Sequence, residues 1–422
     1  MTDDIVLLLR RAGFGPTVAE IGAARRLGYA STLSGVLAPT GPDVGATSAP
    51  TPDLGPDPVT LLPTATEAQR AEVARRRTEQ TVSLARWWLD RMTVADHQAV
   101  EKLLFFWHGH WATSVAKVRS PQLMFGQLRA FREARDFADL AHRMVLDRAL
   151  VYWLDGQHNK KSAPNENLAR ELFELFMLGV GQYTERDIKE AGRALAGWRV
   201  ILDREMPVSE PQHRDTGRKT ILGVTENFDA RSLVDLLLRQ PACSRFIASR
   251  LWFRYASSNR PIPERTREAM AAAFPAPMAM LKVLFADEAF QQTRGTLVQQ
   301  PVEWLVGAMR HLGLRPAAMS DKVFTQLYWA MEALGQRPLA PPSVGGWPAG
   351  TAWLTSAAAQ TRLTIAGMLV DMVRPGPLTP EAVAHLLCVD RWTDRTYAVL
   401  RDARSDRLKL TFGLVSPEYL VT

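Results

Sequence analysis

Residues 158–179, HNKKSAPNENLARELFELFMLG, hold the pattern that decides the predicted fold. Pro164 and Asn165 mark the start of a helix with Asn165 as its N-cap, and Gly179 stands where a C′ glycine would end that helix. Because an α-helix turns by about 100° per residue, the polar side chains of this stretch share one arc. The opposite arc holds the apolar side chains of Leu168, Leu172, Leu175 and Phe176. The stretch therefore predicts an amphipathic helix.

Two acidic residues of the polar arc are candidates for chemistry. Glu171 and Glu174 are three positions apart, so their carboxylates are neighbours on one face of the helix. Two such carboxylates can ligate a metal ion or share a proton. Salt bridges with Arg170 or Arg193, on a face turned to solvent, explain the same pattern equally well. Both interpretations stay open at this point.

The composition limits the class of protein. The chain has 422 residues, of which 46% are hydrophobic, and a formal charge of +7. It can therefore bury a large core, and its arginines are spread along helical segments without a basic stripe, so no nucleic-acid partner is expected. Cys243 and Cys388 form no CxxC motif, which argues against a cysteine zinc site and a disulfide framework.

The expected cellular location depends on two kinds of sequence feature, a signal peptide and a membrane-spanning segment. Its first residues, MTDDIVLLLRRAGFG, have no basic stretch followed by a long apolar run. No run of about 18 uncharged apolar residues occurs, so we expect no membrane span. A cytoplasmic location is the simplest expectation.

Apolar residues recur at helical spacing along most of the chain. We therefore predict a mainly α protein, a large multi-helix globular fold with a small β or irregular insertion around residues 199–227. Residues 1–37 are predicted as an N-terminal helical segment. Residues 38–66 are rich in Pro, Gly, Ala, Ser and Thr, and they are predicted as a linker or surface loop of poor order. Residues 67–422 then form the main helical domain.

The sequence FFWHGHWATS contains the strongest metal-binding signal. His108 and His110, separated by one glycine in a segment expected to be extended, can reach one metal ion, and neutral imidazole suits zinc, copper and iron. An HxH pattern also arises by chance in loops. His213, in the loop QHRDTGRK, is the candidate third ligand, and His158 is its substitute.

The segment GQRPLAPPSVGGWPAGTAWL, residues 335–354, is predicted as an irregular loop. Its Trp347 and Trp353 are costly to leave in water. We expect these indoles to lie over the core as a lid or wall near the histidines.

Several motifs together resemble the bacterial domain-of-unknown-function 1800 family, which has no defined biochemistry. The matching stretches keep the family's order along most of the chain: LLRRAGFGPT, KLLFFWHGHWATS, PNENLARELFELFMLGVGQYTERDIKEAGRALAGW, HRDTGRKTILG and GQRPLAPPSVGGWP. The family pattern FWHNHF is FWHGHW here, which keeps both histidines. The resemblance implies that the functional positions are His108, His110, Asn165, Glu166, Asn167, Arg170, Glu171, Glu174, His213, Asp215 and Lys219.

These observations favour a metal-dependent enzyme, an oxidoreductase that acts on a small organic molecule. In this hypothesis His108, His110 and His213 hold a copper, iron or zinc ion, and Glu171 or Glu174 is a fourth ligand or a general base. Arg170 and Lys219 orient an anionic group or the carboxylates. A zinc-dependent hydrolase is chemically reasonable as well. The rival is a non-catalytic helical scaffold or assembly protein, whose polar motifs form a buried structural network.

Overall fold

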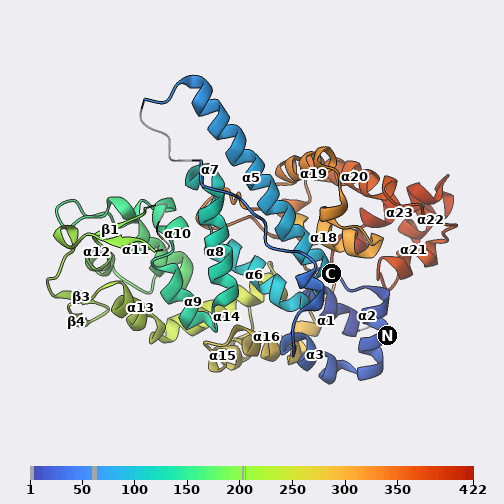
Figure 1. Ribbon diagram of the computed structural model, residues 1–422. Coiled ribbons are helices and arrows are strands. Elements are labelled where there is room, and N and C mark those ends of the chain that lie inside the picture. Colours follow the sequence, from blue (N-terminus) through green and yellow to red (C-terminus); the bar gives the residue numbers. More distant parts are fainter. Residues whose placement is uncertain (1–3, 59–63, 202–203, 205) are drawn as a thin grey trace.

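The computed structural model of the protein describes residues 4–58, 64–201, 204 and 206–422. The described part is mainly α-helical, as the apolar spacing predicts, and its helices form an elongated body with α6 near the middle (Figure 1). None of the described helices combines the length and apolar character that crossing a bilayer requires.

The N-terminal segment is helical, as predicted, and its described residues form three helices. They are α1 (Asp4–Ala12), α2 (Val18–Leu27) and α3 (Tyr29–Leu37). Gly28 separates the last two with φ 77°, a conformation that only glycine adopts without strain. Thr17 caps α2 through a capping box with Glu20.

The segment after α3 follows the surface beside the next long helix. Apart from the short helix α4 (Val44–Thr47), residues 38–58 are irregular, and Asp43 accepts the backbone N–H groups of Ala46, Asp96 and His97. The Trp87 indole donates to the carbonyl of Ala49 at 3.1 Å. These bonds hold the segment despite its low apolar content. The expected loop also includes residues 59–63, which lie outside the described residues.

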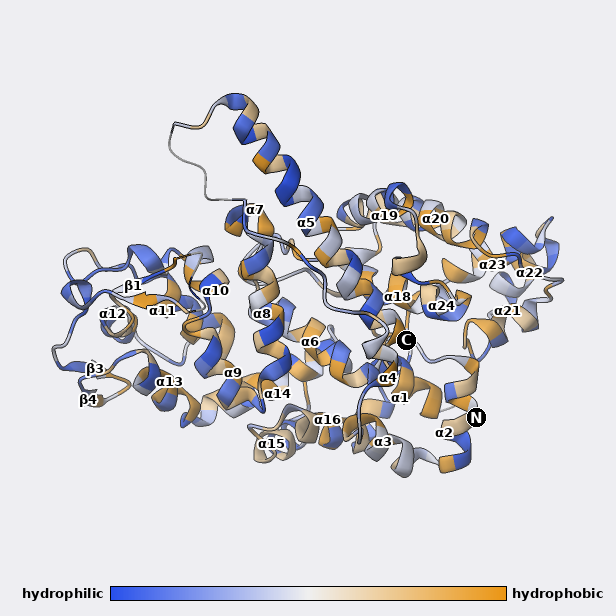
Figure 2. Ribbon diagram, in the orientation of Figure 1, coloured by the Kyte–Doolittle hydropathy of each residue, from blue (hydrophilic) through white to orange (hydrophobic). Residues whose placement is uncertain are grey.

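The long helix α5 (Glu67–Val94) begins where the sequence predicts, with a capping box between Thr66 and Gln69. Its charged first half projects from the body, and its apolar second half is buried (Figure 2). The next helix, α6 (Gln98–His110), crosses the core and is buried over most of its length. Four helices follow: α7 (Val115–Val118), α8 (Pro121–Glu133), α9 (Phe137–Met144) and α10 (Arg148–Trp153). Of these, α8 packs against α6, and the other three pack against α8.

The central stretch of sequence forms two consecutive helical segments near one end of the molecule. A 3₁₀ turn, η1 (Gly156–His158), leads to α11 (Asn167–Glu171), which continues as the π-helix η2 (Leu172–Met177). Gly179 ends it with φ 84°, as predicted for a C′ glycine. Thr184 then caps α12 (Glu185–Ala194), with Asp187 at the third helical position.

The small β region also lies where the sequence predicts it. In the described residues it comprises two antiparallel two-stranded sheets joined by the 3₁₀ turn η3 (Pro211–His213). The first pairs β1 (Trp198–Arg199) with β2 (Val208–Ser209), and the second pairs β3 (Lys219–Ile221) with β4 (Val224–Glu226).

Helices make up the rest of the chain. Pro241 is the first residue of α14 (Pro241–Tyr255), a position that suits proline, and it separates this helix from α13 (Ala230–Leu238). The remaining helices are α15 (Glu264–Ala272), α16 (Pro277–Ala286), α17 (Glu288–Gln291), α18 (Pro301–Leu312), η4 (Pro316–Ala318), α19 (Asp321–Ala333), η5 (Gly350–Trp353), α20 (Ser356–Asp371), α21 (Pro380–Leu386), α22 (Asp394–Asp402), α23 (Asp406–Leu414) and α24 (Pro417–Leu420).

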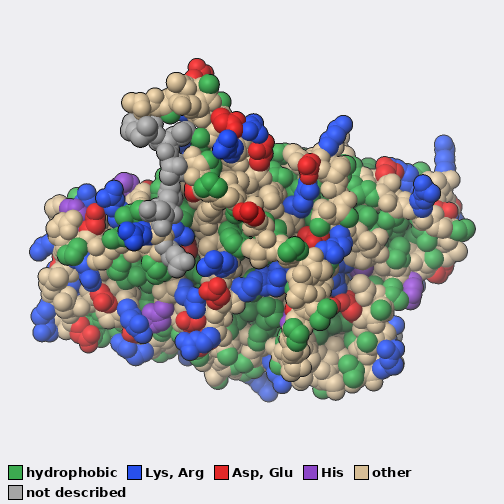
Figure 3. Space-filling view, viewed as in Figure 1, with side chains coloured by type: hydrophobic (Ala, Val, Ile, Leu, Met, Phe, Trp, Pro, Cys, Tyr) green, Lys and Arg blue, Asp and Glu red, His purple; other side chains and the backbone are tan. Residues whose placement is uncertain are grey.

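One large hydrophobic cluster runs through the molecule and includes side chains from α1 to α24. The two ends of the chain meet beside it, because Arg10 of α1 donates to the carbonyl of Tyr419 at 2.7 Å. On the face shown in Figure 3, Lys and Arg side chains are interspersed with acidic and hydrophobic ones. The division of the chain into three parts stays a prediction.

Candidate functional site

The HGH motif is helical, so the expectation of an extended segment is wrong. His108, Gly109 and His110 are the last three residues of α6, and the N–H of Trp111 still donates to the carbonyl of Trp107 at 2.8 Å. Two residues along a helix correspond to a rotation of about 200°. The imidazoles of His108 and His110 therefore point to different sides of α6, which prevents the shared metal site that an extended HxH would allow.

His108 is enclosed by two tryptophans. Its ring centroid lies 5.1 Å from that of Trp88 and 5.2 Å from that of Trp347, and both rings approach edge to face. The side chain has no exposed surface, and neither ring nitrogen has a hydrogen-bond partner among the described residues. Burial lowers the pKa of His108 to about 3. The ring is therefore neutral at pH 7 and is packed as an aromatic group.

His110 has a defined tautomer. Its Nε2 lies 2.9 Å from the carbonyl oxygen of Phe176, in the π-helix η2. Because a carbonyl only accepts hydrogen bonds, Nε2 carries the ring proton and Nδ1 keeps its lone pair. Nδ1 is buried and has no partner among the described residues. Burial, reinforced by the charge of Arg250, lowers the pKa of His110 to about 3.

A small cavity of about 40 Å³ borders His110. It lies between α6, α14 and the loop 345–349, and its lining includes Arg250, Arg254, Gln300 and Trp347. Trp347 thus forms a wall beside the histidines, as predicted. Trp353 is buried too, but its ring packs against Gly335, where a Cβ would stand 3.2 Å from it.

The two arginines of this cavity differ in their partners. Arg254 forms an ion pair with the buried Glu303 at 3.3 Å, and Lys102 reaches the same carboxylate at 3.1 Å. The Arg250 guanidinium has neither an ion pair nor a hydrogen bond to a described residue, and it lies 5.7 Å from the ring centroid of Phe253. Burial and the charge of Arg254 lower the pKa of Arg250. The cavity therefore has an excess of positive charge.

The other two candidate histidines lie elsewhere. His213 ends η3, and its carbonyl accepts the N–H of Lys161 at 2.9 Å. His158 ends η1 and is exposed. In the part of the chain that the structure describes, no three His, Cys, Asp or Glu side chains gather as metal ligands. His108, His110 and His213 therefore do not converge on one ion in this arrangement.

The carboxylates of the central helix form a separate face. Glu174 accepts the Tyr183 hydroxyl at 2.6 Å, and burial together with Glu174 raises the pKa of Glu171. Both residues are half-buried, and neither lines the cavity beside His110. Arg170 makes a two-pronged ion pair with Glu185, at 2.9 and 2.7 Å, and it does not pair with Glu171 or Glu174.

The start of this helix differs by one residue from the prediction. The N-cap position is Glu166, because α11 begins at Asn167. Asn165 still provides a hydrogen-bond acceptor at the start of the helix, since its side-chain oxygen accepts the N–H of Asn167 at 2.9 Å. The tight turn formed this way replaces a regular N-cap.

Most of the remaining motif residues hold backbone groups in place. Asn159 is buried, donates to the carbonyl of Gly192 at 2.7 Å and accepts the N–H of Asn165 at 3.0 Å. Asn167 donates to the carbonyl of Leu154 at 3.1 Å. These bonds tie the approach to α11 onto α10 and α12.

Lys219 belongs to the same kind of network. Its ammonium group donates to the carbonyls of Asp215 and Gly217, each at 2.8 Å, and to the Asn227 side chain at 3.2 Å. All three donors are therefore used inside the loop that carries them. Asp215 pairs with Arg193 of α12 at 2.8 Å. These contacts favour a structural role for Lys219 over the orientation of a substrate.

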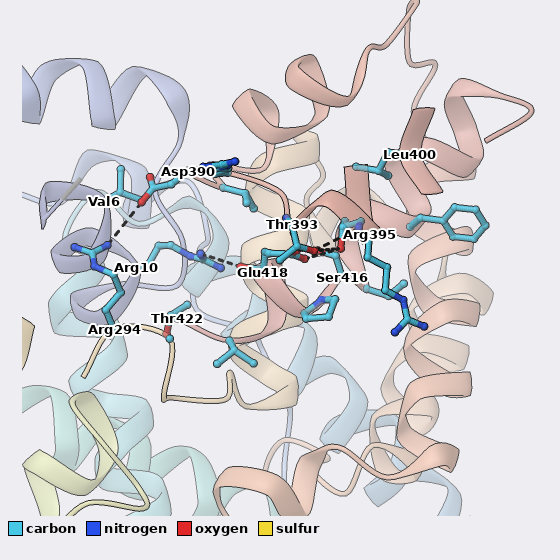
Figure 4. A pocket seen from close by; sticks show the side chains of 18 of the residues that line it. Val6, Arg10, Arg294, Asp390, Thr393, Arg395, Leu400, Ser416, Glu418 and Thr422 are labelled. Atoms are coloured by element: carbon cyan, nitrogen blue, oxygen red, sulfur yellow. Dashed lines mark hydrogen bonds and ion pairs between the residues drawn. The ribbon is translucent and has the colours of Figure 1, made fainter. Parts of the chain in front are cut away.

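Two much larger hollows of the described part contain none of the predicted site residues. One of about 850 Å³ lies between α1 and the helices α22 to α24 (Figure 4). Several of its polar groups pair with one another: Glu418 accepts from Thr393 at 2.7 Å and from Thr396 at 3.1 Å, and Arg294 lies 3.7 Å from Asp390.

Sequence reasoning missed Arg250 and Arg254. Both are on α14, four residues apart in RLWFRYA, and therefore lie on one face of a helix that is otherwise apolar there. Two arginines on the same face of a core helix were the signal that could have identified them, because buried arginines need an anionic partner.

The fold and the site define a mainly α-helical protein with a buried cavity formed by a neutral histidine and two arginines. The sequence profile described as "Protein of unknown function (DUF1800)" matches residues 7–421, so the chain belongs to this family. The resemblance drawn from the motifs is thereby confirmed. Comparisons with curated proteins and with solved structures each gave no match.

Proposed function

We propose that the protein is an enzyme that acts on a small organic anion in the cavity between α6, α14 and residues 345–349. One observation carries the proposal: His110, whose Nδ1 has no partner, lines the same cavity as Arg250, whose guanidinium has no ion pair or hydrogen bond to a described residue. A half-buried charge without a counter-ion is unfavourable, so the site is prepared for an anionic ligand. A planar guanidinium binds carboxylate and phosphate in two-pronged fashion.

His110 is placed to receive a proton or a hydrogen bond from the bound molecule. Its Nε2–H is fixed on the carbonyl of Phe176, which orients the ring and leaves Nδ1 as the acceptor. Burial is the main cause of the low pKa of His110, and the charge of Arg250 adds to it. An anion bound at Arg250 would offset this second effect and would make Nδ1 more basic.

The size of the cavity limits what enters it. A volume of about 40 Å³ holds an acidic head group and not a whole metabolite. Phe253, which is 37% exposed, borders the cavity on its outer side. The rest of the substrate would therefore lie along Phe253, while Trp347 and Phe106 keep water from the head group.

Metal-dependent oxidation remains a second candidate. The unpaired ring nitrogens of His108 and His110 favour it, because neutral imidazole is a good ligand for copper, iron and zinc. The two rings point to different sides of α6, and the guanidinium groups near His110 repel a cation. We therefore propose an anion as the primary ligand of this cavity. Elemental analysis of protein purified without added metal tests whether the second candidate function, metal-dependent oxidation, applies.

A non-catalytic scaffold is the alternative that the Asn159 and Lys219 networks favour. Both networks connect neighbouring segments, and the ammonium group of Lys219 uses all three of its donors within its network. If the protein neither binds nor converts any small acid and contains no metal, the scaffold is the better description.

The matched variants Arg250→Ala and Arg245→Ala test the proposed binding and conversion of a small acid. Both residues are on α14, but Arg245 is exposed and pairs with Glu268 at 2.7 Å. We would screen small carboxylates and phosphates by thermal shift and calorimetry, then follow each binder by proton NMR for conversion. The wild type and Arg245→Ala should bind and convert the same acid, and Arg250→Ala should do neither. Equal binding by Arg250→Ala would contradict the proposal.

We also propose a cytoplasmic location. Cys243 and Cys388 are both buried free thiols, as expected for a protein kept in a reducing compartment. Cell fractionation followed by immunoblotting tests this.

A further inference from the structure

A second site lies away from His110, in a hollow of about 280 Å³ between α5, α7 and α19. Its lining contains three arginines from three parts of the chain: Arg77 of α5, Arg119 at the end of α7, and Arg337 after α19. The wall beside them is aromatic, with Tyr328 and Trp329. No Asp or Glu is among its described lining residues.

Two of the three arginines of this hollow have no direct partner among the described residues. The Arg119 guanidinium makes no ion pair or hydrogen bond with a described residue, and the same is true of Arg77. Burial lowers the pKa of Arg77, Asp57 opposes this effect, and the charge of Arg119 adds to it. Two guanidinium groups that line one hollow without an ion pair favour an anion beside them. Arg337 has a partner, since it pairs with Glu332 at 2.8 Å.

Arg119 is held in an unusual backbone conformation. Its φ of 54° and ψ of 15° are left-handed, which is costly for a residue other than glycine, Asn or Asp. A glycine would cap α7 there without strain. The structure keeps an arginine instead, and its side chain borders the hollow.

The aromatic wall supplies a flat surface. The Arg337 guanidinium carbon lies 4.5 Å from the ring centroid of Trp329, so the two planar groups form a stack. Trp329 is 42% exposed, which is high for so large an apolar side chain. Nucleic-acid bases stack on tryptophan rings and on guanidinium planes in the same way.

We propose that this hollow binds a nucleoside phosphate. The phosphate lies between Arg77 and Arg119, and the base extends the stack of Arg337 on Trp329. The volume is near the lower limit of small-molecule sites, which suits one nucleotide and not a dinucleotide. Thr78 and Thr81 also line the hollow. Their hydroxyls donate to the carbonyls of Ala74 and Arg77 at 2.9 and 2.7 Å, so they can accept a hydrogen bond from the ribose.

Calorimetry with ADP as the probe tests the site, with inorganic phosphate, adenosine and a single-stranded oligonucleotide as comparisons. The variants are Arg119→Gly, which suits the left-handed backbone, and Trp329→Ala, which changes an exposed residue. Arg76→Ala is the matched control, because Arg76 neighbours Arg77 on α5 but pairs with Glu72 at 2.7 Å and does not line the hollow. Melting curves check that every variant is folded.

We expect ADP to bind the wild type and Arg76→Ala alike, and at least tenfold more weakly to Arg119→Gly and to Trp329→Ala. Phosphate and adenosine alone should each bind at least tenfold more weakly than ADP. The proposal is overturned if ADP does not bind at millimolar concentration, or if its affinity is the same in both variants. It is also overturned if phosphate binds as tightly as ADP, or if the oligonucleotide binds more tightly than ADP.

Discussion

The carbonyl oxygen of Gly109 lies 2.2 Å from the point where a Cβ of residue 346 would stand, so Gly109 and Gly346 touch through their backbones. Gly346 has φ 84°, which suits glycine alone. This contact joins the HGH motif of α6 to the GGW motif of the loop and sets Trp347 against His108. The two motifs are over two hundred residues apart in the sequence, yet they form one wall of the cavity beside His110.

Gly346→Ala should therefore displace the loop from α6. The added methyl group would clash with the backbone of Gly109, and the φ angle of residue 346 is disfavoured for alanine. We therefore expect a loss of about 2–4 kcal/mol in the free energy of unfolding. Urea titration measures it. Gly345→Ala is the control, because Gly345 is exposed and its Cβ would meet only the Ser343 hydroxyl, at 3.6 Å. Similar losses in both variants would show that the backbone contact is unimportant.

Lys219→Met tests whether the family lysine is structural. Its side chain is buried and donates three hydrogen bonds, so methionine would leave two carbonyls unsatisfied. We expect a loss of about 2–3 kcal/mol. Binding of the small acid at Arg250 should keep its affinity, as measured by calorimetry on the folded variant. A stable Lys219→Met that has lost the acid would instead place Lys219 in the binding site.

The secondary structure could be predicted well because its signals are local. Gly28, Gly179, Thr184 and Pro241 each mark a helix boundary through their own backbone or side-chain chemistry, and the structure places boundaries there. The π-helical turn after Glu171 could not be predicted, since the sequence LFELFM fits an ordinary helix as well. Its stability depends on tertiary contacts such as that of His110 with Phe176.

The candidate site could be predicted only in part. His110 was identified, but its partner groups come from α14 and from the loop after α19, and no local pattern brings those segments to α6. The grouping of His108 with His110 failed because it depended on the backbone conformation at Gly109. A helix separates the two rings, and an extended strand would have brought them together. The buried hydrogen bond of Asn159 could not be predicted either, because its partner, the carbonyl of Gly192, belongs to α12.

His108→Phe should make the protein less sensitive to acid. The pKa of His108 is about 3 in the folded state and about 6.5 in the unfolded chain, so only the unfolded chain takes up a proton between these values. Stability is thus complete above pH 6.5 and decreases below it by about 1.4 kcal/mol per pH unit for this group. Phenylalanine removes this term and fits between Trp88 and Trp347.

Thermal unfolding between pH 7.5 and 4.5 measures the effect, and the advantage of the variant should grow as the pH falls. His311→Phe is the contrast, because both nitrogens of His311 are used, by the Tyr419 hydroxyl and the carbonyl of Pro16, each at 2.9 Å. That variant should be less stable at pH 7.5. Should the wild type contain metal that His108→Phe lacks, the ring of His108 is a ligand and the metal-dependent candidate gains support.

Asp147→Asn should stabilise the protein at neutral and alkaline pH. Burial raises the pKa of Asp147 to about 6, although its side chain caps α10 by accepting the N–H of Leu150 at 2.9 Å. The unfolded chain ionises near pH 3.9, so folding stability decreases as the pH rises from about 4 to 6 and is then constant. Asparagine keeps the cap without the charge. We expect the free energy of unfolding of Asp147→Asn to exceed that of the wild type by about 1–2 kcal/mol at pH 8 and to equal it at pH 4. The difference is smaller than the full pKa shift implies because Asp147 is half-buried.

Asp139→Asn should show the opposite pH dependence. Burial raises the pKa of Asp139, but the N–H of Arg135 and the charge and hydrogen bond of Arg143 outweigh it and lower the pKa below its usual value. Its carboxylate therefore stabilises the fold above the unfolded pKa, and this contribution is lost as the pH falls. Asp139→Asn should be less stable than the wild type at pH 8 and equal to it at acid pH. Chemical denaturation of both variants at pH 4, 6 and 8 measures the two pH dependences. If the stability of both variants relative to the wild type changed with pH in the same way, burial of Asp147 would not control its ionisation.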